Sequence, residues 1–123
     1  MQTEPPEPPA VEIYFSPEFK KKLGALAKKY RNVRSDIHTV LSQLQVGEFV
    51  GDRISGVGED YVVFKVRIKN SNIPKGKSAG YRLIYQVESS TSVLLLSIYS
   101  KSDQQDIALS DIRSILAEFY RDD

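Results

Sequence analysis

The hydrophobic positions at the beginning of the chain predict one strand and one helix. Val11–Phe15 is a short β-prone run, and it is followed by Ser16 and Pro17, residue types that begin helices as a side-chain cap and as the first helical residue. Apolar side chains then recur at helical spacing, which predicts an amphipathic helix of about four turns. Its apolar positions are Phe19, Leu23, Leu26, Ala27 and Tyr30.

A second helix is predicted directly after the first. Asn32 or Ser35 can open it, because both residue types cap helix N-termini, and Gly47 can end it. The apolar positions in between are Ile37, Val40, Leu41 and Leu44. We expect the two helices to form a hairpin.

The second half of the chain predicts three strands. Residues 61–69 alternate between apolar positions and positions that are mostly cationic. This alternation indicates a half-buried strand with a cationic open face. One face carries Val62, Phe64, Val66 and Ile68, and the other carries Val63, Lys65, Arg67 and Lys69. Tyr81–Val87 and Ser92–Tyr99 are two further β-prone runs joined by polar residues, so we expect a hairpin there and an antiparallel meander of three strands.

The C-terminal segment predicts a third helix. Ser110 can cap it, and one apolar stripe follows at helical spacing. The stripe comprises Ile112, Ile115, Leu116 and Phe119. The order β-α-α-β-β-β-α predicts an α+β fold in which a curved antiparallel sheet packs on helices at one side.

The length of 123 residues allows one hydrophobic core, so we expect a single domain over residues 12–123. Residues 1–11 contain four prolines and predict a disordered or extended tail. The absence of cysteine excludes disulfides, thiolate metal ligands and a cysteine nucleophile. The sequence has neither a bilayer-spanning apolar run nor a signal-peptide pattern, so we expect a soluble cytoplasmic protein with no membrane partner.

The net charge of +1 conceals an uneven distribution of charge. Residues 13–101 contain 15 Lys and Arg against 7 Asp and Glu, whereas residues 1–12 contain 3 acids and no base, and residues 102–123 contain 2 Arg against 6 acids. A basic body is expected of nucleic-acid binders, because phosphate contacts supply most of their affinity. A well-solvated surface explains the same charges, so charge alone leaves both interpretations open.

Familiar catalytic and cofactor motifs are missing from the sequence. It contains no P-loop, no dinucleotide-type glycine-rich turn, no metal-ligand spacing and no Ser-His-Asp set. His38 is the only histidine and lies off the apolar face of the second predicted helix, so we expect it to be solvated. We therefore expect neither a metal ion nor a small-molecule cofactor.

The remaining candidate site is a set of side chains on the three predicted strands. Lys65 and Arg67 share one face of the first strand, and Arg82 lies early in the second. Tyr99 and Lys101 leave the third strand with the same parity, so all five can converge on one patch of a meander. Cleavage of RNA by its own 2′-hydroxyl needs a base, cations and an acid, which such residues can supply. An ordinary solvated strand face explains the same pattern.

The segment Ala79–Val87, with the sequence AGYRLIYQV, resembles the central strand of toxins of the RelE/ParE superfamily. Phe64–Lys69 upstream and Leu95–Lys101 downstream lie at suitable distances for the neighbouring strands. The predicted order of elements also matches, so the resemblance covers roughly residues 12–120. Ser100–Asp106 resembles the strand-to-helix junction of the HigB/RelE branch in particular.

This resemblance implies a RelE-like fold and the toxin role in a type II toxin–antitoxin system. In the RelE branch the toxin is a metal-independent endoribonuclease, an mRNA interferase, which cuts mRNA on the ribosome by attack of the 2′-hydroxyl on the phosphodiester. The implied partners are a cognate antitoxin protein and ribosome-bound mRNA, and no cofactor is implied.

The resemblance also assigns roles to the candidate residues. Arg82 matches the arginine that steadies the scissile phosphate, and Lys65 and Arg67 match a pair of basic residues that stabilise charge, one of them a candidate base. Lys101 falls where RelE proper has an arginine assigned to the leaving group. The tyrosine that RelE proper carries at the start of its last helix corresponds to about Ile107, so this role is vacant; Tyr99 either replaces it or serves in packing. The long 70–78 connection implies RNA-backbone contacts from Lys69, Lys75 and Lys77.

Two alternatives to the nuclease stay open. ParE-type members use the same scaffold to poison DNA gyrase, and they tend to lack a full basic catalytic set. The third possibility is a non-catalytic module of the same fold that binds nucleic acid or protein, which the missing tyrosine at Ile107 allows.

Overall fold

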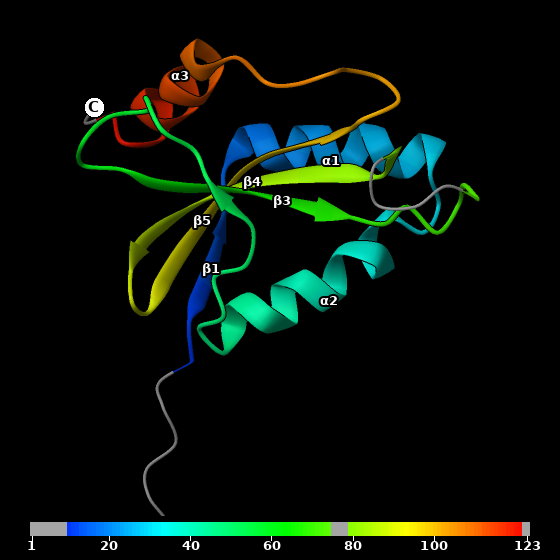
Figure 1. Ribbon diagram of the computed structural model, residues 1–123, viewed down its shortest axis with the longest axis horizontal. Helices are drawn as coiled ribbons and strands as arrows, with labels where there is room; N and C mark the ends of the chain where they lie inside the picture. Colours follow the sequence, from blue (N-terminus) through cyan, green and yellow to red (C-terminus); the bar gives the residue numbers. More distant parts are fainter. Residues whose placement is uncertain (1–9, 75–78, 122–123) are drawn as a thin grey trace, which may run out of the picture.

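The computed structural model of the protein describes residues 10–74 and 79–121, and these form three helices and a five-stranded sheet (Figure 1). In chain order the elements are β1 Glu12–Phe15, α1 Pro17–Lys29, α2 Val33–Gln45, β2 Asp52–Arg53, β3 Val62–Ile68, β4 Tyr81–Ser89, β5 Ser92–Ser100 and α3 Leu109–Phe119. The predicted order is confirmed, with the two-residue β2 as an addition. None of the helices in this described part of the chain is long and apolar enough to cross a bilayer.

The sheet has the strand order β1-β5-β4-β3-β2. β3, β4 and β5 form the predicted antiparallel meander, and β2 pairs antiparallel with the outer side of β3. β1 is parallel to β5, with Glu12 opposite Ser92 and Phe15 opposite Leu95. The expectation of a wholly antiparallel sheet was therefore wrong at this edge. No tight turn joins β1 to β5, so their relative direction is not fixed by a hairpin.

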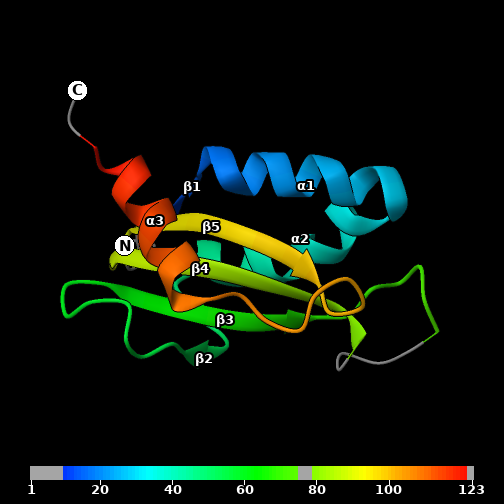
Figure 2. The same ribbon diagram turned by 90° about the horizontal axis from the view of Figure 1, so that it is seen from above.

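Helices cover both faces of the sheet, which corrects the expectation that they pack on one side. α1 and α2 pack against one face, where Leu83, Tyr85 and Leu95 point, and α3 packs against the other, where Ile84 and Leu96 point (Figure 2). β4 and β5 are nearly continuous buried runs, so both of their faces must be removed from water.

The first helix begins at the predicted cap. Ser16 Oγ accepts a hydrogen bond from the Phe19 N–H at 3.0 Å, and its hydroxyl donates to the Leu96 carbonyl of β5 at 2.9 Å. The predicted cap of α3 was wrong, because Ala108 is the N-cap and Ser110 lies inside the first turn without a capping bond. The cap of α3 has no side-chain acceptor, so residue type alone could not locate it.

Two close backbone contacts tie connecting segments to the domain. The N–H of the buried Val11 donates to the Gln45 carbonyl at 3.0 Å, so this residue of the tail expected over residues 1–11 packs on the domain, and residues 1–9 lie outside the described residues. Gly80, which directly precedes β4, lies so close to β3 that a Cβ there would stand 2.0 Å from the Ile68 carbonyl oxygen. Only glycine permits this approach.

The double role of Ser16 predicts a measurable loss of stability. We expect Ser16→Ala to lower the free energy of unfolding by about 1–2 kcal/mol, because the Phe19 N–H loses its acceptor at a helix start. The matched control is Ser110→Ala, which removes an exposed hydroxyl without a capping bond and changes the free energy by less than about 0.5 kcal/mol. Urea unfolding followed by circular dichroism measures both, and equal effects would contradict the assignment of the cap.

Candidate functional site

Three of the candidate side chains lie in one rung of the sheet. Arg67 of β3 is directly opposite Arg82 of β4, and Arg82 is directly opposite Tyr99 of β5. All three point to the α3 face, because they alternate with residues of the other core. Lys65, two positions before Arg67, shares their face. The predicted convergence is therefore confirmed for these four residues.

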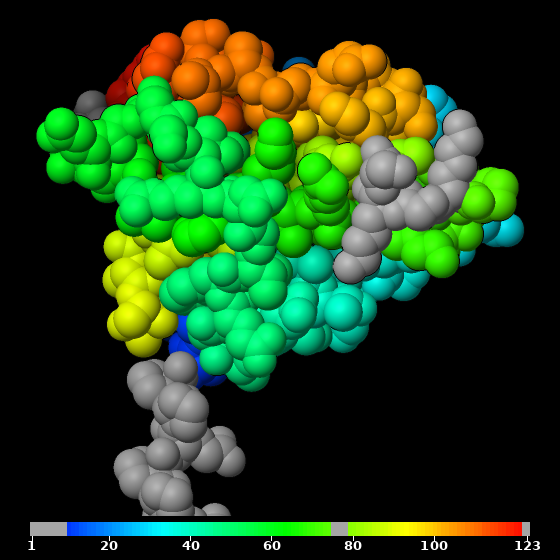
Figure 3. Space-filling view, viewed as in Figure 1, coloured from blue at the N-terminus to red at the C-terminus, as the bar shows by residue number. Residues whose placement is uncertain are grey.

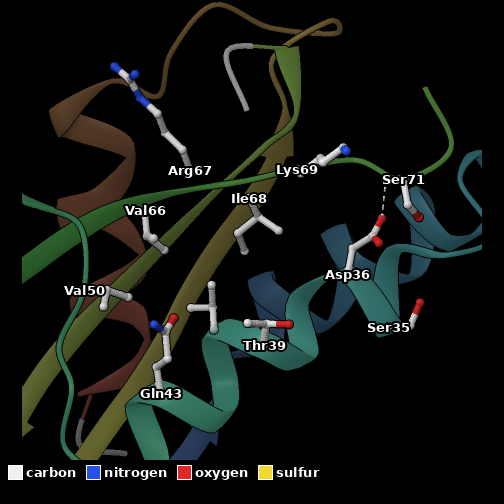
Figure 4. Close-up of a pocket in the computed structure, with 11 residues that line it drawn as sticks. Ser35, Asp36, Thr39, Gln43, Val50, Val66, Arg67, Ile68, Lys69 and Ser71 are labelled. Atoms are coloured by element: carbon white, nitrogen blue, oxygen red, sulfur yellow. Dashed lines mark hydrogen bonds between the residues drawn. The ribbon is translucent and has the colours of Figure 1, made fainter. Parts of the chain in front are cut away.

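The central arginine of this rung is buried. Arg82 is only 5% exposed, and its Nη1 donates to the Tyr81 carbonyl at 3.2 Å. Burial, and then the charge of Arg67, lowers the pKa of the guanidinium below its usual value. Arg67 is exposed, and Figure 4 shows its side chain directed away from α2, on the opposite side of β3 from Val66. Two like charges on directly paired positions repel each other, so an anion placed between them would be held strongly.

Tyr99 and Lys65 meet at a carboxylate that sequence reasoning missed. Asp106 Oδ1 accepts hydrogen bonds from the Tyr99 hydroxyl at 3.2 Å and from Lys65 Nζ at 3.4 Å. Tyr99 is 4% exposed, and its burial, with the nearby charge of Asp106, raises the pKa of its hydroxyl to about 12. Tyr99 is thus packed, and it also lies beside the other candidate side chains. The only signal for Asp106 in the sequence is an acid that follows a basic strand end.

Lys101 borders the site. Its N–H donates to the Gly80 carbonyl at 2.8 Å, which extends the β4–β5 pairing past Tyr99. Its ammonium donates to the Gln105 carbonyl and so contacts the segment that leads to α3. Lys69 is exposed just beyond the end of β3. Lys75 and Lys77 lie outside the described residues.

Ile107 stands where a tyrosine was expected from the family pattern. It is partly buried and packs against the apolar cluster beneath α3, two residues before that helix begins. The side chain at this position therefore supplies packing and no polar group. His38, expected to be solvated, is exposed on α2.

The segment 101–108, which leads from β5 to α3, lies across the site. Asp103 forms an ion pair of 2.6 Å with Lys29 at the end of α1, and Asp106 reaches Lys65 on β3. Gln104 Nε2 donates to the Asp106 carbonyl at 2.9 Å and stabilises the turn. In the space-filling view this orange segment lies against the green side chains of the β2–β3 region (Figure 3).

A separate hollow lies on the other side of β3. It has a volume of about 540 Å³ between α2 and β3, and Asp36 accepts a hydrogen bond from the Ser71 N–H at 2.9 Å at its end (Figure 4). Among residues 10–74 and 79–121, no three acidic or histidine side chains are grouped so that they could hold a metal ion. Arg67 and Lys69 contribute to the rim of this hollow, whereas Lys65 and Arg82 lie on the α3 face alone.

Comparison with known proteins identifies a matching family and similar solved structures, among them a toxin–antitoxin complex. The family model that matches, over residues 13–105, is described as the ParE toxin of the type II toxin–antitoxin system parDE. A chain of the crystal structure of the E. coli DinJ–YafQ toxin–antitoxin complex superimposes with a TM-score of 0.51 at 13% identity, covering 78% of this chain and 98% of that one. At this identity the match supports a shared fold. A search of curated proteins finds no matching sequence.

The like-charged pair in the rung predicts a stability gain on removal of one charge. We expect Arg67→Gln to raise the free energy of unfolding by roughly 0.2–1 kcal/mol at low salt, because Arg82 then loses a repulsive neighbour. The gain should shrink in 1 M salt, which screens the repulsion. Lys69→Gln is the matched control, since this exposed lysine lies beyond the paired strand. A destabilised Arg67→Gln protein in urea unfolding at low salt would refute the repulsion.

Proposed function

The chain belongs to the ParE toxin family of type II toxin–antitoxin systems, and we propose that on this family's scaffold it acts as an endoribonuclease that cuts mRNA on the ribosome without a metal ion. Toxins of type II systems have a cognate antitoxin as their protein partner. Because the chain belongs to this family, we expect it to have such a partner as well. The observation that carries the nuclease proposal is the rung of Arg67, Arg82 and Tyr99, flanked by Lys65.

A scissile phosphate fits the chemistry of this rung. Arg82 is buried and its guanidinium has a fixed orientation, so it can donate to two phosphate oxygens without a large loss of side-chain entropy. Arg67 approaches from the neighbouring strand and adds a second charge. As the phosphate becomes pentavalent it gains negative charge, and cations already in place stabilise that charge most.

The reaction needs two proton transfers. The 2′-oxygen attacks phosphorus while its proton passes to a base, the bond from phosphorus to the 5′-oxygen breaks, and the departing oxygen takes a proton. We assign the base to Lys65, because arginine stays protonated, and charge stabilisation to Arg67; the acid is Lys101, with Tyr99 as a second donor to the phosphate. The products are a 2′,3′-cyclic phosphate and a free 5′-hydroxyl.

The remaining basic side chains fit RNA-backbone contacts. Lys69 is exposed next to the rung, and we assign to it, and to Lys75 and Lys77, contacts with phosphates flanking the cut. Ribosome-bound mRNA as substrate and a cytoplasmic location belong to the same proposal.

The second candidate function is the poisoning of DNA gyrase. The family-model match favours it, since the model is that of the ParE toxin. The same rung would then bind a phosphate or a carboxylate of the target without cutting it. A non-catalytic binding module is the third candidate, and one experiment distinguishes all three.

The test uses a substitution that removes the charge of the buried Arg82 but keeps most of its side-chain volume. Arg82→Ala would leave a cavity as well as remove a charge, so we choose Arg82→Met, which keeps most of the volume. We expect induced expression of the wild-type chain to arrest growth and to produce codon-phased cuts in cellular transcripts, seen by primer extension. Arg82→Met should reduce cutting at least about 100-fold, because it removes a buried phosphate donor.

Arg31→Met is the control, because this exposed arginine lies in the turn between α1 and α2, and we expect it to keep full toxicity. Circular dichroism must show that both variants are folded. Growth arrest with a DNA-damage response and uncut transcripts would establish the gyrase alternative. The absence of any arrest would leave the binding module, and a fully active Arg82→Met toxin would refute the site.

A further inference from the structure

One carboxylate oxygen collects three donors at the edge of the proposed site. Asp106 Oδ1 accepts from the Ile107 N–H at 2.8 Å, from the Tyr99 hydroxyl at 3.2 Å and from Lys65 Nζ at 3.4 Å. Two of these donors belong to side chains that the proposed reaction uses, and the third is a main-chain group. The three donors, one of them charged, converge on a single anionic atom.

The same three donors suit a phosphate oxygen equally well. Both a carboxylate and a phosphodiester bear a negative charge over oxygens that accept two or more hydrogen bonds. The Ile107 N–H, assisted by Lys65 and Tyr99, holds the pKa of the Asp106 carboxyl below its usual value, so the group is anionic at neutral pH. The Asp106 carboxylate therefore stands where an oxygen of a substrate phosphate would stand.

The contacts that hold Asp106 in this place are weak ones. Its side chain is 65% exposed and that of Lys65 is 33% exposed, and ion pairs at such exposure contribute little to stability. The other ionic anchor of the segment, between Asp103 and Lys29, is also exposed. The exposed Asp106 side chain can rotate away while the backbone of the segment stays in place, so the Ile107 N–H remains available to another acceptor. A polyanion such as RNA can displace the carboxylate.

We propose that Lys65, Tyr99 and the Ile107 N–H form a second phosphate-oxygen subsite beside the Arg67–Arg82 rung, and that Asp106 occupies it until RNA replaces the carboxylate. This inference rests on the proposed function for the identity of the ligand, an RNA phosphodiester. Asp106 is then an internal competitor, and the affinity for RNA is lower than the cationic side chains alone would give. In this arrangement Arg67 and Arg82 bind the scissile phosphate of the RNA backbone. The subsite binds a further phosphate oxygen of the same backbone.

The test measures binding separately from cleavage. The probe is a single-stranded oligoribonucleotide with 2′-O-methyl groups, which keeps every phosphate and cannot be cut because its attacking oxygen is blocked. We expect Asp106→Asn to bind it roughly three- to tenfold more tightly than the wild type, because the competing charge is gone. Asparagine Oδ1 still accepts from the Ile107 N–H, so the segment keeps its local bond.

Asp103→Asn is the matched control. It removes the same charge from the same segment, but Asp103 pairs with Lys29 of α1 and not with the subsite. We expect a change of less than about twofold in its affinity, the effect of net charge alone. In the wild type, the amide resonance of Ile107 should shift when the probe binds, since its acceptor changes.

The outcomes separate this inference from the proposed function. Equal or weaker binding by Asp106→Asn, or equal gains in both variants, overturns the competitor role even if the wild type cuts RNA. Tighter binding by Asp106→Asn alone supports it, even if no transcript is cut in cells and the nuclease proposal fails. Failure of the wild type and both variants to bind the probe overturns the subsite, whereas the nuclease proposal is judged by the cuts in cellular transcripts.

Discussion

The burial of the β4–β5 hairpin on both faces is the constraint on which the rest of the structure depends. Nearly every side chain from Tyr81 to Gln86 and from Val93 to Ser100 is withdrawn from water. One face is covered by α1 and α2 and the other by α3, so the three helices are divided between two layers. The α3 helix covers only part of its face. The uncovered part, spanned by the segment 101–108, is where the polar side chains of the central strands can act.

Burial of a charged residue inside this hairpin disfavours folding, and the phosphate contact proposed for Arg82 would give that residue a role that offsets this effect. Arg82 lies in the middle strand, where its neighbours on the same strand are apolar or aromatic, and it faces a second arginine across the ladder. Neither burial nor like-charge repulsion favours the folded state. In the proposed complex, a bound phosphate would offset both effects, because it accepts hydrogen bonds from the buried guanidinium and lies between the two positive charges. Asp106 forms an ion pair with Lys65 on the same face of the sheet.

Sequence reasoning located the strands and the rung but could not locate the long-range packing. Alternation at Lys65 and Arg67 and the parity of Tyr99 fixed which side chains share a face, because the period of a strand is two. The parallel edge at Glu12–Phe15 and the second helical layer depend on tertiary contacts that no local pattern carries, although the unbroken apolar run of β5 was a signal for the second layer. Asp106 was missed because its role comes from a contact with a strand 41 positions away.

The parallel pairing of β1 with β5 has a consequence for folding during synthesis. The β1–α1 junction is joined to β5 by Ser16, whose hydroxyl bonds a carbonyl 80 positions later. During synthesis the helical hairpin therefore emerges long before the strand on which it packs, and the closing contacts are among the most non-local of the fold. Incomplete chains lack the last strand and with it Tyr99, so they cannot assemble the rung. The rung of Arg67, Arg82 and Tyr99 can therefore form only after nearly all of β5 has been synthesised.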